Sequence, residues 1–350
     1  MAVANEISTR QPPPDALYVG AKGEIEETVV PRAGISLETM VGGGLHGVGP
    51  VRFVRNLFRM GRGFVQAWRI LGRFRPDVLF LTGGYVSVPV ALVAWLRRRP
   101  ILVYLPDVEP GRAIQLLSRI ATQVAVTVED SGRYLPADKM VVTGYPLRPE
   151  FQRVKLAGKQ AAKAHFGISP EDRVLLVFGG SRGAQSINRA LGTVLETVLA
   201  HMRVIHISGR LDAEACQSRR DALPESIRTR YHLFDYVHDI AKALAAADLV
   251  VARAGAATLA EFPFYGLPAI LVPYPYAWRY QKVNADYLAE RGAAIRLNDQ
   301  DMREQLWPTI KALFDDGARL QEMSDNACVL ARPDAAARLG DLLTELARTR

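Results

Sequence analysis

Glu261 and the small residues before it could bind a nucleotide. Ala254-Gly255-Ala256 separate an apolar stretch, residues 249–252, from a predicted helix that begins near Ala256. The first amides of a helix have no internal partners and carry the positive end of its dipole, so they can hold a phosphate. One to two turns later, the Glu261 carboxylate could accept hydrogen bonds from both hydroxyls of a ribose. The alternative is that Glu261 is a solvated helix residue and Gly255 only a tight turn.

Two further glycine-rich turns follow predicted strands. Gly83-Gly84-Tyr85 come after residues 77–82, and a second turn, residues 179–183, comes after the apolar stretch 174–178. In the second turn, Ser181 could add its hydroxyl to the amides that face a phosphate. This turn lacks GxGxxG spacing and an acidic residue about 20 positions later, which argues against a dinucleotide.

Two carboxylates, Asp107 and Glu109, follow a predicted strand at residues 101–105. The carboxyl ends of parallel strands are where open α/β sheets bind ligands. The alternative is that these side chains cap the helix that starts at Gly111.

A DxD sequence occurs at residues 298–301, and such a sequence holds a metal-bound nucleotide sugar in some glycosyltransferases. Here it directly precedes a predicted helix. We therefore expect an N-cap role and no metal.

The composition indicates a globular protein with an acidic partner. The chain has 350 residues, a net charge of +8 and only two cysteines, Cys216 and Cys328. So few cysteines suit a reducing cytoplasm. No signal peptide is visible at Met1, and the apolar run at residues 86–96 is too short to span a bilayer. A positive charge alone does not distinguish nucleic acid, anionic lipid and a phosphorylated substrate.

Residues 49–76 form a basic amphipathic segment without an acidic residue. Its arginines are Arg52, Arg55, Arg59, Arg62, Arg69, Arg73 and Arg75, interleaved with Phe53, Leu57, Phe58, Phe64, Trp68 and Leu71. Such a segment is typical of helices that lie on anionic membranes. The alternative is a crossover helix whose apolar stripe packs on the sheet while the arginines are solvated.

Alternating strands and helices predict two α/β domains that face a cleft. The predicted strands are residues 16–20, 77–82, 101–105, 124–128, 140–143, 174–178, 204–208, 231–234, 249–252, 269–272 and 294–297, and residues 2–10 are predicted to be helical. We expect an N-terminal domain at residues 1–150, a link at 151–171, a C-terminal domain at 172–333, and a last helix at 334–350 that packs back on the first domain.

Several stretches together resemble one family. They are GGYVS at 83–87, GGSRGAQSIN at 179–188, AGAATLAE at 254–261, GLPAILVP at 266–273 and QKVNA at 281–285. In this order they resemble the MurG family, glycosyltransferase family 28, whose members add N-acetylglucosamine to complete lipid II in peptidoglycan synthesis. The resemblance covers nearly the whole chain.

The resemblance implies a GT-B fold, with two Rossmann-like doubly wound domains. UDP-N-acetylglucosamine would be held mainly by the C-terminal domain. By position, its binding residues would be Asp107, Arg148, Ser181, Val237, Ala256, Ala257, Thr258, Leu259, Ala260, Glu261, Gln281 and Asn284. The resemblance assigns the ribose to Glu261, the uracil to backbone groups of Val237, and sugar hydroxyls to Gln281 and Asn284. Gly83, Gly84 and Tyr85 would lie at the acceptor's diphosphate.

The implied reaction is an inverting transfer that needs no metal or cofactor. The implied acceptor is undecaprenyl-pyrophosphoryl-muramyl-pentapeptide, and the implied location is the cytoplasmic face of the membrane, with no nucleic-acid partner. The family's first strand and its GGTGGH loop, whose histidine is the favoured base, would lie before Ala2. We expect translation to start further upstream. In the chain as given, the base is unassigned, with Asp107 and Glu109 as candidates.

Asp107 also stands where the family has an asparagine that contacts the donor, because Tyr104-Leu105-Pro106-Asp107 replaces the family's His-Glu-Gln-Asn. Two alternative functions stay open, the first because it can share this architecture and membrane contact, and the second because the base loop is absent. One is a UDP-sugar-dependent diacylglycerol glycosyltransferase, and the other is a catalytically silent UDP-sugar-binding protein.

Overall fold

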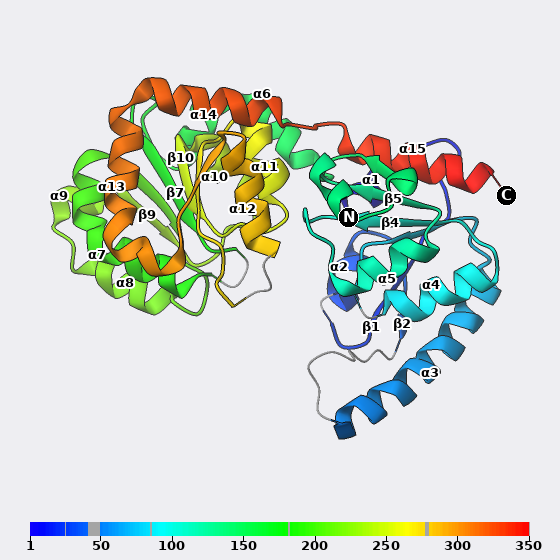
Figure 1. Cartoon of the computed structure of the whole chain (residues 1–350). Coiled ribbons are helices and arrows are strands. Elements are labelled where there is room, and N and C mark those ends of the chain that lie inside the picture. The colour runs from blue at the N-terminus through cyan, green and yellow to red at the C-terminus, as the bar shows by residue number, and fades with distance from the viewer. Residues whose placement is uncertain (25, 41–49, 85, 181–182, 277–279, 350) are drawn as a thin grey trace. The chain divides into compact units, whose positions relative to one another are not determined.

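The chain folds into two compact units, each built around parallel strands (Figure 1). The computed structural model describes residues 1–24, 26–40, 50–84, 86–180, 183–276 and 280–349, with the backbone alone for residues 50–60. Unit 1 comprises Met1–Pro146 and Asp334–Arg350, and unit 2 comprises Leu147–Pro333. The α/β class with two Rossmann-like domains is therefore confirmed.

Unit 2 contains a six-stranded parallel sheet with the order β12-β11-β10-β7-β8-β9. Its strands are β7 (Val174–Phe178), β8 (Arg203–Ile207), β9 (Tyr231–Phe234), β10 (Leu249–Ala252), β11 (Ala269–Leu271) and β12 (Ala294–Arg296). From β7 the chain first builds the sheet outward through β8 and β9, and then returns to place β10 on the other side of β7. The strand order thus reverses between β7 and β10, and such a switch point is where doubly wound sheets bind ligands.

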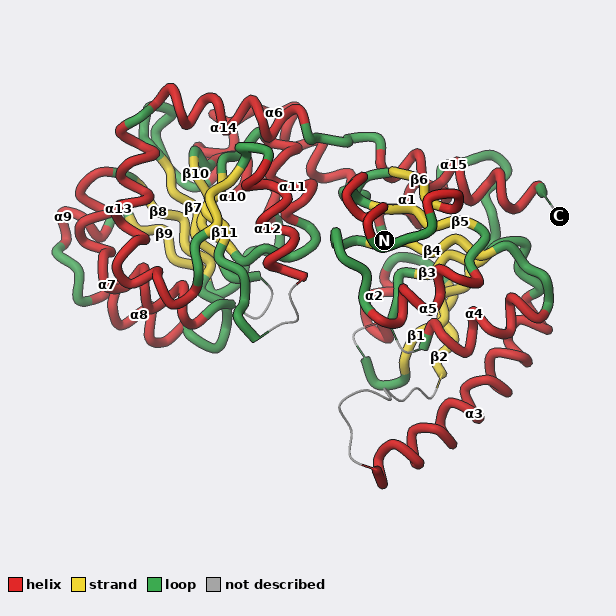
Figure 2. The backbone as a smooth tube through the Cα atoms, viewed as in Figure 1, coloured by secondary structure: helices red, strands yellow, loops and turns green. Residues whose placement is uncertain are grey.

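Helices enclose the strands of unit 2 on both faces (Figure 2). They are α6 (Pro149–His165), α7 (Gln185–His201), α8 (Ala213–Asp221), α9 (Glu225–Arg228), α10 (Ile240–Ala246), α11 (Thr258–Tyr265), α12 (Tyr280–Glu290), α13 (Met302–Asp315) and α14 (Gly317–Val329), with a short 3₁₀ turn, η3 (Asp299–Asp301). Strands covered on both faces must be apolar throughout. All four residues of β10 are accordingly buried.

The segment at residues 151–171, expected to link the two domains, is mostly helical and is grouped with unit 2. Most of this segment forms α6, which belongs to unit 2 and packs against α10. Phe151 is 1% exposed, so this polar-looking segment still buries an apolar side chain. Gly158, at φ 85° and ψ 165°, is not helical, so α6 consists of two helical segments that meet at a kink. The sequence is mostly polar because only one stripe of the helix faces the core.

Unit 1 has a four-stranded parallel sheet, β3-β4-β5-β6, and a separate parallel pair, β1-β2. Its strands are β1 (Leu17–Ala21), β2 (Ser36–Met40), β3 (Leu79–Leu81), β4 (Ile101–Leu105), β5 (Gln123–Val126) and β6 (Met140–Val142). Its helices are α1 (Ala2–Ser8), α2 (Glu26–Arg32), α3 (Pro50–Phe74), α4 (Ser87–Leu96), α5 (Arg112–Ile120) and α15 (Ala335–Arg348), with 3₁₀ turns η1 (Glu129–Arg133) and η2 (Ala137–Lys139). The sequence analysis did not predict the strand β2.

The two ends of the chain meet in unit 1. Helix α15 packs against α1. Arg10 joins them through an ion pair with Asp341 at 2.8 Å and a hydrogen bond to Thr344 Oγ1 at 3.1 Å. The residues after Pro333 are therefore part of the same unit as the start of the chain.

Helix α3 carries the basic amphipathic segment and packs against α4. Ala67, Ile70 and Leu71 are buried in the core of unit 1, as expected for a crossover helix. Val65 and Trp68 lie on the exposed side, at 50% and 45% exposure. The side chains of Arg52, Arg55, Arg59, Phe53, Leu57 and Phe58 lie outside the described residues. Among the helices of the described part of the chain, none has the length and apolar character needed to cross a bilayer.

Candidate functional site

The loops after β7 and β10 lie next to each other, because these strands are neighbours in the sheet. In the loop after β7, two glycines are required by packing. A side chain at Gly179 would collide with Ala184, and one at Gly183 would collide with the carbonyl of Ser208. Gly180 has φ 92°, which disfavours other residues. Ser181, predicted to contact a diphosphate, lies outside the described residues.

The turn after β10 leaves an open end at the start of α11. The amides of Thr258, Leu259 and Ala260 donate to the carbonyls of Gly255, Ala256 and Ala257, at 3.0 to 3.1 Å. Three of the five helix-terminal amides expected to face a phosphate, those of Thr258, Leu259 and Ala260, thus have backbone partners within this turn. The amides of Ala256 and Ala257, which precede this first turn, remain the candidates for binding a phosphate.

Gly255 is not required by the local packing. A Cβ built on it meets no atom within 4 Å, and its φ does not lie in the left-handed region. The turn that it begins, closed by the Thr258 amide on the Gly255 carbonyl at 3.0 Å, is therefore open to other residues at this position. The absence of a side chain instead keeps the space above the turn open, as a bound phosphate would need.

Glu261 and Arg148 approach each other from different elements. Glu261 lies in the first turn of α11 and is partly buried, and Arg148 is the N-cap residue of α6. Burial raises the pKa of Glu261 to about 7, against the opposing effect of the positive charge of Arg148. Arg148 also pairs with Glu150 at 2.8 Å. Two residues predicted to bind a nucleotide sugar thus lie within electrostatic reach of each other.

Arg253 connects the strand ends around this turn, and the sequence analysis did not identify it. Its side chain is 9% exposed. Its Nη1 donates to the carbonyls of Val272 at 3.1 Å and Pro273 at 3.2 Å, both after β11. Its Nη2 donates to Ser186 Oγ at 2.6 Å, in the first turn of α7. An arginine directly after a buried strand, within a run of small residues, is the signal that could have identified it.

Asp299 completes this cluster. Its Oδ1 lies 2.5 Å from Arg253 Nη1 and accepts a hydrogen bond from Ser186 Oγ at 2.7 Å. Asn298 and Asp301 stand at the N-cap positions of η3 and α13, as expected for this sequence, but neither side chain makes a capping hydrogen bond. In the described residues there is no group of three or more His, Cys, Asp or Glu side chains placed to hold a metal ion.

Helix α12 contributes a side chain that holds the turn after β10. Asn284 is fully buried and its Nδ2 donates to the carbonyl of Ala254 at 3.1 Å. A direct contact with a sugar hydroxyl would require this side chain to leave its buried position. Gln281 is partly exposed, and its Oε1 accepts a hydrogen bond from the amide of Tyr274 at 2.9 Å. Of the two side chains, that of Gln281 is therefore the more accessible to solvent.

Val237, predicted to face a uracil, lies in the irregular segment between β9 and α10. This segment follows the carboxyl end of its strand, as do the glycine loop and the turn after β10. Val237 thus lies at the carboxyl edge of the sheet, the edge at which doubly wound sheets in general bind ligands. It is partly buried, between the exposed side chains of Tyr236 and His238.

In unit 1, the predicted acceptor and base residues also follow strand ends. Gly83 and Gly84, at φ 98° and 86°, form the turn between β3 and α4, where Ser87 Oγ donates to the carbonyl of Gly83. Asp107 and Glu109 follow β4 and are partly buried, and the N-cap of α5 is Gly111. Tyr85 lies outside the described residues.

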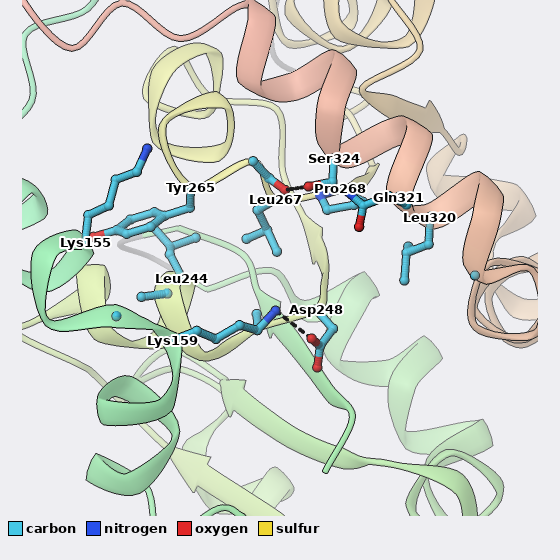
Figure 3. A pocket seen from close by; sticks show the side chains of 15 residues that line it. Lys155, Lys159, Leu244, Asp248, Tyr265, Leu267, Pro268, Leu320, Gln321 and Ser324 are labelled. Atoms are coloured by element: carbon cyan, nitrogen blue, oxygen red, sulfur yellow. Dashed lines mark hydrogen bonds and ion pairs between the residues drawn. The ribbon is translucent and has the colours of Figure 1, made fainter. Parts of the chain in front are cut away.

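A cavity of about 310 Å³ in unit 2 is lined by residues other than these (Figure 3). Asp248 and Pro268, which line it, precede β10 and β11, so the cavity is at the amino edge of the sheet. An ion pair between Lys159 and Asp248 at 2.6 Å crosses part of it. The predicted site is at the opposite, carboxyl edge, and the cavity is not part of it.

Comparison with known families assigns both parts of the chain. Residues 1–126 match the glycosyltransferase family 28 N-terminal domain, and residues 174–339 match the glycosyltransferase family 28 C-terminal domain.

Two relatives are named UDP-N-acetylglucosamine–N-acetylmuramyl-(pentapeptide) pyrophosphoryl-undecaprenol N-acetylglucosamine transferase. The protein from Roseiflexus sp. (strain RS-1) is 41% identical, over 95% of this chain and 83% of its own length. The protein from Desulforudis audaxviator (strain MP104C) is 37% identical, over 99% of this chain and 94% of its own length.

Solved structures share the fold. The crystal structure of Acinetobacter baumannii MurG has a TM-score of 0.78 and 25% identity, and the match covers 98% of this chain and 94% of that one. A UDP-GlcNAc 2-epimerase from Neisseria meningitidis, solved with UDP-GlcNAc bound, has a TM-score of 0.67 over 98% of this chain and 95% of its own. At 14% identity, the epimerase shows similarity of fold alone.

Proposed function

The chain belongs to glycosyltransferase family 28, and we propose that it transfers N-acetylglucosamine from UDP-N-acetylglucosamine to the muramyl 4-hydroxyl of lipid I, giving lipid II. One observation carries the proposal for the donor. Glu261, partly buried beside the turn at the switch point of the unit 2 sheet, lies within electrostatic reach of Arg148, which is distant from it in sequence. A carboxylate for a ribose and a cation for a diphosphate are the two groups that a UDP-sugar requires.

The donor would bind along the carboxyl edge of unit 2. The amides of Ala256 and Ala257, with the hydroxyl of Ser181, would hold the diphosphate. Glu261 would accept hydrogen bonds from the ribose, and Val237 would present its backbone to the uracil. Gln281 would hold the sugar hydroxyls.

The reaction is an inverting displacement at the anomeric carbon. The muramyl 4-hydroxyl oxygen forms a bond to this carbon, and the bond between the carbon and the UDP oxygen breaks. A base takes the hydroxyl proton, and Asp107 and Glu109, after β4, are the candidates. Helix-terminal amides and Arg148 stabilise the negative charge of the departing UDP.

The surface of α3 and α4 supports attachment to a membrane. Trp68 of α3 and Trp95 and Leu96 of α4 are 45%, 53% and 54% exposed, on helices that pack against each other. Arg97 lies 4.4 Å from the Trp68 ring, and Arg98 and Arg99 follow it. Exposed apolar and basic side chains together bind anionic lipid surfaces. We propose that this face holds the chain at the cytoplasmic surface of the membrane, where its lipid-linked acceptor is located.

A transfer assay tests the proposal. The chain is incubated with UDP-N-acetylglucosamine and either lipid I or diacylglycerol in mixed micelles, and the products are identified by mass spectrometry. We expect lipid II and no glycosylated diacylglycerol. Transfer to diacylglycerol alone would overturn the acceptor assignment. UDP-sugar binding without transfer to either acceptor would overturn the activity.

A further inference from the structure

The loop after β11 exposes two tyrosines side by side. Tyr274 is 45% exposed and Tyr276 is 86% exposed. Their ring centroids are 5.7 Å apart and their planes meet at 71°, the edge-to-face geometry that aromatic pairs prefer. Pro273 and Pro275 alternate with them and restrict the backbone of the loop. The loop thus holds an aromatic surface toward solvent in a defined orientation.

Tyr274 is anchored from two sides. The guanidinium of Arg253 lies 5.2 Å from the centroid of its ring, within the range of a cation–π contact. Its backbone amide donates to Gln281 Oε1 at 2.9 Å. The position of the pair is therefore set by the same residues that connect the strand ends of the donor site. An aromatic surface that is already ordered loses little conformational entropy when it binds a ligand.

The pair lies where the sugar of the donor is expected. β11 is paired with β10, whose following turn would hold the diphosphate, and the loop leads to α12, which carries Gln281. A hexosamine ring that is held by its hydroxyls presents C–H groups on its faces. The negative face of an aromatic ring attracts such polarised hydrogens and shields the apolar face of the sugar from water. A pyranose ring is therefore the ligand chemistry that this surface fits.

We infer that Tyr276, held in place by Tyr274, is a platform for the pyranose ring of the N-acetylglucosamine of the donor. The inference rests on the proposed function, since that function brings this sugar to unit 2. It assigns to the tyrosines a contact with the sugar and none with the nucleotide. Their effect should accordingly depend on the presence of the sugar.

Calorimetric titrations with UDP-N-acetylglucosamine and with UDP separate these contributions. We expect Tyr276→Ala to weaken the affinity for UDP-N-acetylglucosamine by about 5- to 20-fold and to leave the affinity for UDP unchanged. Tyr276→Phe, which keeps the ring, should stay within about twofold of the wild type for both ligands. Leu156→Ala is the matched control, because Leu156 is 79% exposed on α6, away from the loop.

Each outcome decides the inference. Unchanged UDP-N-acetylglucosamine binding by Tyr276→Ala would overturn the platform alone, with the proposed function intact. An equal loss for UDP and UDP-N-acetylglucosamine would also overturn it, because the variant would then distort the nucleotide site. A wild-type chain that binds neither ligand would overturn the proposed function and the platform together.

Discussion

The guanidinium of Arg253 lies 2.5 Å from the carboxylate of Asp299, and this ion pair connects the strand ends of unit 2. Arg253 follows β10 and Asp299 follows β12, while Ser186, at the start of α7, contacts both. The donor substrate, a UDP-sugar, would bind along the same edge of the sheet. The pair therefore stabilises the loops that the proposed site needs.

Asp299→Ala should destabilise unit 2 by about 3 kcal/mol or more, because it leaves the buried guanidinium of Arg253 without its carboxylate. It should also raise the KM for the donor, since the loop after β11 loses its fixed position. Urea unfolding followed by circular dichroism and steady-state kinetics measure the two effects.

The double variant Arg253→Met with Asp299→Ala should cost less than the sum of the single variants, because the two residues interact. Lys311→Ala is the control, since it removes only an exposed ion pair with Asp315 and should change stability by less than about 1 kcal/mol. Additive effects of Arg253→Met and Asp299→Ala would show that the pair is not coupled.

Donor binding should depend on pH through Glu261, whose pKa is raised to about 7 by burial. The ionised carboxylate is the form that accepts two hydrogen bonds from a ribose, so affinity for UDP-N-acetylglucosamine should increase as the pH rises through 7. Titration calorimetry between pH 6 and 8.5, about 1 to 1.5 units either side of this pKa, measures it. Glu261→Gln should bind about tenfold more weakly at high pH and show no such rise.

The same raised pKa has the opposite effect on stability. A carboxyl whose folded-state pKa exceeds its unfolded-state pKa stabilises the fold fully below the unfolded value, and this stabilisation is lost as the pH rises through about 7. Glu261→Gln should remove this loss. The difference in the free energy of unfolding between the wild type and Glu261→Gln should therefore change with pH. The same difference below and above pH 7 would contradict the raised pKa of Glu261.

Gly255→Ala should fold as the wild type does, because the added Cβ meets no atom within 4 Å. It should nevertheless weaken UDP-N-acetylglucosamine binding several-fold, since the methyl group would occupy the space that a phosphate needs. Thermal unfolding and calorimetry measure both. In contrast, Gly179→Ala should lower the melting temperature, because its Cβ would collide with Ala184. Wild-type affinity in Gly255→Ala would place the phosphate elsewhere.

Replacing Trp95 and Leu96 by serine should weaken binding to anionic vesicles by about tenfold or more, because both side chains lose the apolar surface that they would bury in lipid. Co-sedimentation with phosphatidylglycerol vesicles at low and high salt measures this binding. Leu211→Ser, at an exposed position of unit 2, should bind as the wild type does. Equal binding of the variant and the wild type would rule out this surface.

Replacing each candidate base by its amide shows which of the two carboxylates takes the proton. The variant that removes the base, Asp107→Asn or Glu109→Gln, should lower kcat by about 100-fold or more and leave the KM for the donor near that of the wild type. If Asp107 instead contacts the donor, Asp107→Asn should change mainly this KM. Full activity in both single variants would exclude both carboxylates as the base.

The sequence by itself determined the local elements and the family. Buried parallel strands are short apolar runs, so β4, β7 and β10 could be located from residue types alone. Glycine turns after strands, with Glu261 at a helical distance from one of them, indicated a nucleotide site for the same local reason. β2 escaped prediction because Ser36–Met40 is short, mostly half-buried and partly polar.

Only the tertiary structure decided how side chains from distant segments combine. Arg148 comes within electrostatic reach of Glu261 because α6 belongs to unit 2, although the polar sequence of this helix had indicated a link. Asp299 pairs with Arg253 and does not cap its helix, and Asn284 is buried beneath the turn at Ala254. Such contacts depend on the order of the strands in the sheet. This order is set by packing between elements far apart in the chain, and no local period in the sequence records it.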